Sequence, residues 1–355
     1  MKLVSLEVHH DPTKTNWLIA LNVFAATVHV LDGALGLALI GSREPSVEVV
    51  ARLVEFQNAS QGGFFGALPR VVFRSQLLAP GVAVEWITAG FHVVYVAQLA
   101  SPRFGRFMSD WVVGVTSSLN PTRWFEYAVT ATVMSAFGNF GVGINDFYYL
   151  LRTISAGVAL QMCGYALELL DYGNERDRRL AGIAWNIGTV LNLSSVATML
   201  YHIFASKTHT DVFYYNTVPF AIWFNTFGIV AWYQFKRSGP FADPYFVEKW
   251  YVILSLTTKV AVFWLSFSTF RKLIEDRGYV DRTPGVNWVA VRYLASYALL
   301  AVVLGIVIYD AVMYNRQKAQ KLVKKKRRAQ TVQEPAQAGR RRVASCDREF
   351  YYVEL

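Results

Sequence analysis

Residues 249–271 read KWYVILSLTTKVAVFWLSFSTFR, in which Lys259 is the one charge between Lys249 and Arg271. About 20 mostly apolar residues in a helix cross the hydrocarbon core of a bilayer. The stretch therefore predicts a membrane-spanning helix. At a rise of about 1.5 Å per residue, Lys259 lies about 15 Å inside it, counted from Lys249.

The rest of the chain repeats this apolar pattern. Of its 355 residues, 54% are apolar and 17% are charged, whereas roughly a quarter of the residues in soluble proteins are charged. Eight stretches are long and apolar enough to span a bilayer: 16–40, 81–101, 120–144, 148–170, 181–205, 213–235, 249–271 and 288–314. They predict an all-α integral membrane protein with eight spans. The polar N-terminus lacks a cleavage site, so no signal peptide is predicted.

Charge predicts where the ends and the long connection lie. After Tyr314 the chain holds twelve Lys and Arg against four Asp and Glu, which favours a cytoplasmic anchor against anionic lipid over nucleic-acid binding. An even number of spans then places the N-terminus in the cytoplasm as well. The connection 41–80 is rich in β-branched and aromatic residues near 70–75 and has a sequon at Asn58, so we expect an extracellular hairpin. The tail, 316–355, is expected to be disordered.

Lys259 is the most informative residue of the sequence. An ammonium at that depth must lose its proton, find a counter-ion or be chemically changed. An imine with an aldehyde keeps one positive charge and needs one carboxylate beside it. The alternative is an unmodified lysine paired within a transporter cavity, and the residues alone leave both interpretations open.

The expected carboxylate lies in residues 120–127, NPTRWFEY. Pro121 suits the first turn of a helix and Asn120 suits its cap. Glu126 then lies about 9 Å inside the span, on the side from which Lys259 is reached. Arg123 shares its helix face, so we expect an arginine-held counter-ion, with an interfacial Arg–Glu pair as the alternative.

Other polar and aromatic residues inside the spans are weaker candidates. Ser255 lies one turn before Lys259 and can hydrogen-bond near an imine nitrogen. His29 and His92 are placed to receive or relay a proton, although an intramembrane histidine more often bonds a neighbouring helix. The aromatic residues of the sixth and seventh spans, Trp223 among them, fit a wall around a polyene or ordinary packing and interfacial belts. No phosphate loop, metal-ligand spacing or nucleophile elbow stands out, so no enzyme is predicted.

The octamer NPTRWFEY at 120–127 and the motif SLTTK at 255–259 together resemble the heliorhodopsins. These are retinal proteins with a membrane orientation inverted relative to other microbial rhodopsins. The resemblance covers about 16–275. It implies a seven-helix bundle in 1–275 with the hairpin at 41–80, to which this chain adds a further helix within 276–315. It also implies all-trans retinal bound covalently to Lys259 as a Schiff base, with Glu126 as its counter-ion.

The resemblance implies roles for the remaining candidates as well. Ser255 would sit beside the imine. Around the chromophore it places Arg123, Trp124, Tyr127 and Met134. His29 and His92 match the histidines that hold the released proton. The implied protein is a membrane-embedded homodimer, in which light-driven isomerisation and Schiff-base deprotonation lead to signalling through an unknown partner.

Three functions therefore stay open. The first is light sensing, and the second is light-driven or light-gated proton transport by the same chromophore, to which Asp32, Asp146 and Glu168 would add acidic groups. The third is a retinal-free transporter or receptor. Visible absorption separates the third function from the others, and a light-evoked current or pH change separates the second from the first.

Overall fold

A computed structural model describes residues 12–40, 46–56, 65–101, 120–141, 144–170, 175–205, 218–236 and 239–276. Its helices are α1 (Pro12–Leu39), α2 (Ala79–Ala100), α4 (Pro121–Gly141), α5 (Phe147–Leu169), α6 (Glu175–Ala205), α8 (Val218–Phe235) and α9 (Pro244–Asp276). Each overlaps one of the first seven predicted spans. The predicted span at 288–314, the tail and the sequon at Asn58 lie outside the described residues.

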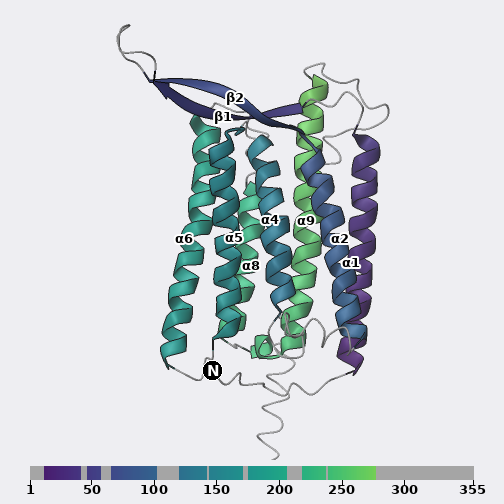
Figure 1. The fold of residues 1–355 in the computed structure, drawn as a ribbon. Helices are drawn as coiled ribbons and strands as arrows, with labels where there is room; N and C mark the ends of the chain where they lie inside the picture. The colour runs from purple at the N-terminus through teal and green to yellow at the C-terminus, as the bar shows by residue number, and fades with distance from the viewer. Residues whose placement is uncertain are drawn as a thin grey trace, which may run out of the picture. The chain divides into compact units, whose positions relative to one another are not determined.

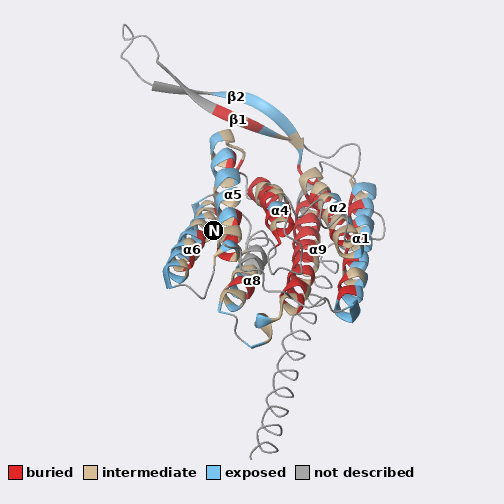
Figure 2. Ribbon diagram, turned by 60° about the horizontal axis from the view of Figure 1, so that its bottom comes forward, coloured by how far each residue is buried: buried red, intermediate tan, exposed pale blue. Residues whose placement is uncertain are grey.

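The helices form a bundle in which α9 has the most neighbours (Figure 1). Successive helices pack in the pairs α1–α2, α2–α4, α4–α5 and α5–α6, and α8 packs against α5 and α9. Helix α9 also contacts α1, α2 and α4. As a result, 72% of its most apolar window is buried, against 11% for α6, a contrast that Figure 2 shows along the two helices. Lys259 thus lies on the most buried of the five helices that are long and apolar enough to cross a membrane.

The described helices have the character of membrane spans. Five of them, α1, α2, α5, α6 and α9, are long and apolar enough to cross a membrane, judged by length and composition. A bilayer core offers no water to backbone N–H and C=O groups, so a spanning segment satisfies them within a helix. The exposed face of α6 carries large apolar side chains, namely Ile183, Ile187, Val190, Tyr201 and Phe204. The chain is therefore an all-α multi-pass membrane protein.

Side-chain caps fix two helix starts. The Oδ1 atom of Asn120 accepts a hydrogen bond of 3.3 Å from the Arg123 backbone N–H, which confirms the expected cap before Pro121. Asp146 caps α5 by accepting 2.8 Å from the backbone N–H of Tyr149. Such caps stabilise a helix by about 1 kcal/mol.

The predicted hairpin is present at one end of the bundle, which we call the hairpin end (Figure 1). Strands β1 (Ser46–Phe56) and β2 (Phe65–Gln76) pair antiparallel, with a register shift between Val49 and Val50. Strand β1 meets the start of α5, where the Val50 N–H donates to the Asn145 carbonyl at 3.0 Å. The buried Val49 side chain joins a core cluster with residues of α2, α4, α5 and α9.

The end of α9 far from the hairpin begins with a short 3-10 turn, η4 (Gly239–Ala242). Gly239 has a φ of 58°, a conformation that glycine adopts without a steric penalty. Asp243 then accepts 3.0 Å from the backbone N–H of Tyr245, and Pro244 is the first residue of the helix. This start lies five residues before the predicted one at Lys249.

Candidate functional site

Lys259 and Glu126 form a buried ion pair between α9 and α4, in which Lys259 Nζ bonds Glu126 Oε1. The lysine is 5% exposed and the glutamate 1% exposed. Ser255 Oγ donates to the same oxygen at 3.2 Å, and Tyr95 on α2 donates its hydroxyl to Oε2 at 2.9 Å. One carboxylate therefore meets one ammonium and two hydroxyls, which disperse its charge.

Because the pair is buried, removal of either Lys259 or Glu126 would destabilise the protein. Removing one partner of a buried pair typically costs about 3–5 kcal/mol, because the other charge stays in a low-dielectric site without compensation. The positive charge of Lys259 and the negative charge of Glu126 thus hold each other in place. Three helices, α2, α4 and α9, are joined at this point.

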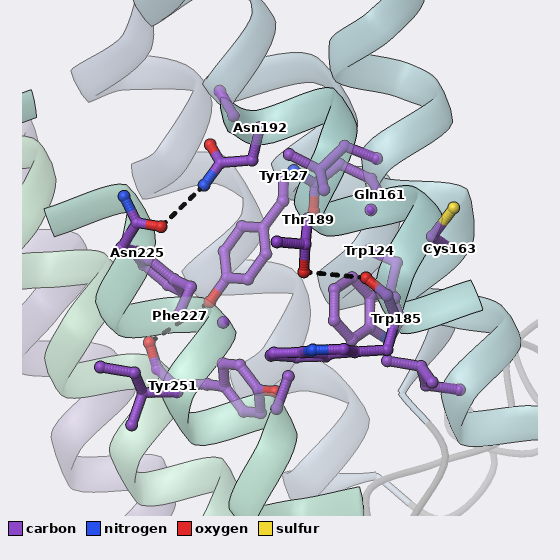
Figure 3. Close-up of a pocket in the computed structure, with 18 of the residues that line it drawn as sticks. Trp124, Tyr127, Gln161, Cys163, Trp185, Thr189, Asn192, Asn225, Phe227 and Tyr251 are labelled. Atoms are coloured by element: carbon purple, nitrogen blue, oxygen red, sulfur yellow. Dashed lines mark hydrogen bonds between the residues drawn. The ribbon is translucent and has the colours of Figure 1, made fainter. Parts of the chain in front are cut away.

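On one side of the pair, Lys259 lines an apolar cavity of about 350 Å³. Helices α4, α5, α6, α8 and α9 all contribute to its wall, and Figure 3 shows its aromatic side chains together with an amide pair. Trp124, Tyr127 and Met134, all expected here, do line it. Of the described lining residues, Lys259 is the only charged one. The volume falls within the range of ordinary small-molecule pockets.

Small residues on the neighbouring helices leave room for this cavity. Gly164, Gly188 and Gly228 line it on α5, α6 and α8. A Cβ atom at Gly164 would overlap the ring of Trp124, so the absence of a side chain lets that indole lie flat against α5. Asn192 donates to Asn225 at 2.9 Å across the α6–α8 side of the cavity (Figure 3). The result is an apolar space with the side chain of Lys259 in its wall.

A second, much smaller cavity lies toward α1 and α2. It measures about 20 Å³, and Glu126, Ser255, Tyr95, His92 and Asn22 are among its lining residues. A volume of this size accommodates about one water molecule when polar partners surround it. The carboxylate of Glu126 thus faces a polar space that reaches His92.

The two predicted histidines come together beside this small cavity. The rings of His29 and His92 stack with centroids 5.5 Å apart and an interplanar angle of 9°. His92 Nδ1 bonds Asn22 Oδ1 at 2.7 Å, and His29 Nδ1 bonds Glu85 Oε2 at 2.5 Å. All four side chains are buried, so this is a closed polar cluster inside the bundle.

A family model for heliorhodopsins matches residues 18–270. The chain belongs to the heliorhodopsin family. No curated protein matches the chain. Membership supports an integral, multi-pass membrane protein of a light-sensing rhodopsin family, for which a retinal chromophore is the general expectation. The expected assignment is thus confirmed on the fold and on the family.

Arg123 of this heliorhodopsin does not hold Glu126, and that expectation is wrong. Its guanidinium forms ion pairs with Glu168 of α5 and Glu248 of α9 instead. Its Cζ atom lies 3.8 Å from the ring centroid of Tyr251. Arg123 and Glu126 do share a face of α4, because they are three residues apart. The side chains of α5 and α9 nevertheless reach the arginine and pair with it. Glu168 and Glu248 thus belong to a structural network that ties α4, α5 and α9 together.

Glu85 and Asn22 were not predicted as site residues from the sequence. Glu85 occupies the fifth position of the predicted span 81–101, where a charge is easily taken for an interfacial one. The signal was present all the same, because Glu85 and His92 are seven residues apart and therefore lie on one helix face. Of the other candidates, Asp146 caps α5, and the side chain of Trp223 lies outside the described part of the chain.

The residues present fit retinal. The cavity is apolar, residues of five helices line it, and three glycines are among them. At its wall stands one buried lysine with one buried carboxylate, the combination that a cationic imine requires. Lys259 would hold the group, and Trp124, Tyr127, Met134 and Phe227 would contact its hydrocarbon part.

Proposed function

We propose that this heliorhodopsin is a light-sensing protein that binds all-trans retinal covalently on Lys259. The single observation that carries the proposal is the position of Lys259, which is buried against Glu126 and lines the apolar cavity at the same time. Retinal joined to this amine supplies absorption of visible light, isomerisation and a titratable proton on the lysine nitrogen.

The chain's own residues have separate tasks in this proposal. Glu126 balances the positive charge at the Lys259 nitrogen, and the hydroxyls of Ser255 and Tyr95 orient its carboxylate. Trp124 and Tyr127 pack at the cavity wall and restrict the shapes that a bound polyene can adopt. The small polar cavity beside Glu126 offers an exit for a proton that leaves the lysine nitrogen, with His92 at its wall.

The test is a visible absorption spectrum of the protein expressed with all-trans retinal. We expect a pigment band that disappears in Lys259→Arg, which keeps the positive charge beside Glu126 but cannot form an imine. In Glu126→Gln the band should shift, because the charge that stabilises the lysine nitrogen is gone. Lys249→Arg, at the start of the same span, is the matched control and should keep the band.

The absence of a visible band would be as informative as its presence. A wild-type protein that folds in detergent, elutes as a single species and shows no visible band would contradict retinal binding. It would favour the remaining alternative, a retinal-free transporter or receptor in which Lys259 is an ordinary paired cation.

Light-driven or light-gated proton transport is a second candidate function. The observation that favours it is the polar cluster of His92, His29 and Glu85, which extends from Glu126 toward the hairpin end. Light-evoked current in a voltage-clamped cell, or a light-evoked pH change in a cell suspension, would support transport. A pigment that gives neither, at matched expression, supports sensing through a signalling partner.

The proposal includes an assembly and an orientation. We infer a homodimer in which the hairpin takes part, with both chain ends in the cytoplasm and the hairpin outside. Exposed apolar side chains on β2, namely Val71, Val72 and Phe73, support a contact there. Crosslinking through Val72→Cys, compared with an exposed position on α6 such as Val190→Cys, tests the dimer. Labelling of the Val72→Cys thiol with an impermeant reagent on whole cells tests the orientation.

A further inference from the structure

The cluster of His29, His92 and Glu85 is more than a pair of histidines, because an acid lies at its far end. Glu85 and His29 are each 0% exposed and His92 is 1% exposed. In the described part of the chain, Glu85 Oε1 and the Nε2 atoms of both histidines are buried without a hydrogen-bond partner. Buried polar atoms are nearly always bonded, so these three atoms have hydrogen-bonding capacity that a proton or a water molecule can use.

The hydrogen bonds of His92 determine where it accepts a proton. Asn22 donates its amide N–H to the Leu18 carbonyl at 2.8 Å, which leaves its Oδ1 as an acceptor. His92 Nδ1, 2.7 Å from this oxygen, must therefore carry a hydrogen. A neutral imidazole has one N–H and one lone pair. The lone pair of His92 is thus on Nε2, and a proton arriving from the Lys259 side binds there.

Glu85 and His29 together hold one proton. A buried carboxylate without a positive partner is costly, and so is a buried imidazolium without a negative one. With one proton shared across the 2.5 Å contact of Glu85 Oε2 and His29 Nδ1, the pair is electrically neutral. Charge neutrality therefore predicts that the pair carries its proton in the dark, while His92 remains a neutral acceptor.

The groups lie in order from Lys259 toward the hairpin end. Glu126 pairs with Lys259, and Glu126 and His92 line the same water-sized cavity. His92 stacks on His29, which bonds Glu85. Asp32 follows His29 by one turn of α1 and interacts electrostatically with Glu85. Trp264 donates 3.1 Å to Asp32 Oδ1, and Asp32 Oδ2 is buried without a described partner.

We propose that Glu85 is a proton-release group, which gives its proton to Asp32 when His92 takes the proton that leaves the Lys259 nitrogen. The inference rests on the proposed function. The lysine nitrogen keeps the electron pair of the broken N–H bond, and the Nε2 lone pair of His92 forms the new one. The Glu85 O–H bond then breaks and its electron pair stays on the Glu85 carboxylate. Asp32, which is ionised before the transfer, binds the proton through a lone pair of one carboxylate oxygen and becomes neutral.

Charge explains why the two transfers are coupled. A cation on His92 disfavours a second cation on His29, whose ring is stacked 5.5 Å away. The same cation stabilises a carboxylate at Glu85, so the cluster is neutral before and after the exchange. The other charges that act on Glu85 are those of Asp32 on α1 and Lys259 on α9. The positive charge of Lys259 favours ionisation of Glu85, and this influence ends when the lysine nitrogen loses its proton. The positive charge that arrives on His92 then favours ionisation of Glu85 instead.

The first test needs no retinal. Infrared spectra of the apoprotein near neutral pH are compared for wild type, Glu85→Gln and Glu85→Asp. We expect a protonated-carboxyl C=O band that is lost in Glu85→Gln and shifted in Glu85→Asp. The control is Asp146→Asn, which keeps the cap of α5 and should leave the band intact. A wild-type spectrum identical to that of Glu85→Gln in this region would mean that Glu85 is ionised in the dark, and would overturn the proposal.

The second test uses the pigment. The light-minus-dark infrared difference should show loss of the Glu85 band and gain of an Asp32 band, the latter absent in Asp32→Asn. Flash spectroscopy of Glu85→Gln should show deprotonation of the lysine nitrogen slowed by about a hundredfold, the order of a missing acid–base partner. A pigment that deprotonates at the wild-type rate in Glu85→Gln would overturn this inference alone. Failure to form any pigment would overturn the release step and the proposed function together.

Discussion

The two sides of α9 differ in the kind of side chain that they bury. Toward α1 and α2 the bundle encloses Glu85, His29 and His92 with almost no free space. Toward α5, α6 and α8 it encloses an apolar cavity of about 350 Å³, and Lys259 is the only charged residue among the described residues that line this cavity. Lys259 connects the two sides, because its amine bonds Glu126 and its side chain lines the cavity.

Packing explains how one chain keeps these sides apart. Between α1, α2 and α9, glycines allow close contact: a Cβ atom at Gly36 would lie 3.1 Å from Val82, and one at Gly81 would lie 3.0 Å from Phe137 and from Phe263. Between α5, α6 and α8 the glycines line the cavity and also contact neighbouring side chains, since a Cβ atom at Gly188 would lie 3.3 Å from Leu160. The side toward α1 and α2 is therefore closely packed, with space for about one water molecule, and the cavity side leaves space for a ligand from outside the chain.

The largest expected effect concerns the buried charges, and Arg123→Met tests it. The substitution leaves Glu168 and Glu248 buried without their cation. We expect destabilisation of about 3–5 kcal/mol, measured by equilibrium unfolding in detergent. The pigment band, where it forms, should stay at its wild-type position because Arg123 does not bond Glu126.

The matched control for this substitution is Arg179→Met. Arg179 forms an ion pair with Glu175 on the exposed start of α6, and such exposed pairs contribute less than about 0.5 kcal/mol. Equal losses of stability in the two variants would contradict the assignment of Arg123 to a buried network. A large band shift in Arg123→Met would instead favour direct contact with the counter-ion.

Most of the fold was predictable, because a bilayer restricts spanning segments to long apolar helices. The Lys259–Glu126 pair was predictable from their depths along two spans. The partners of Arg123 were not, since Glu168 and Glu248 reach it from helices whose rotation about their axes only packing determines. Glu85 was hidden by its place near a span end. The cavity was out of reach as well, because glycines such as Gly164 indicate close contact and open space equally well in a sequence.

The cavity side should respond to volume rather than to charge, which Gly164→Ala tests. Its new Cβ would overlap the Trp124 ring and displace the indole into the cavity. Overpacking of this kind costs about 1–3 kcal/mol, and we expect pigment formation to fall several-fold. The visible band per milligram of folded protein, measured after retinal addition, gives the yield.

Gly182→Ala on α6 is the control for that experiment. A Cβ there would have no atom within 4 Å, so the pigment yield should be unchanged and the helix slightly stabilised, by about 1 kcal/mol or less. A normal yield in Gly164→Ala would show that Trp124 is free to move and does not form a fixed wall of the cavity.

The smallest expected effect belongs to the neutral hydrogen bond of the cavity side, between Asn192 and Asn225. Interhelical hydrogen bonds inside membranes contribute about 0.6 kcal/mol on average, far below the loss expected at Arg123. A double-mutant cycle with Asn192→Ala, Asn225→Ala and the pair measures this coupling in equilibrium unfolding. A coupling of a few tenths to about 1 kcal/mol would support the contrast between an ionic and an apolar side of α9. A coupling as large as that of the buried ion pairs would contradict this contrast, because polar groups would then stabilise the ionic and the apolar side of α9 equally.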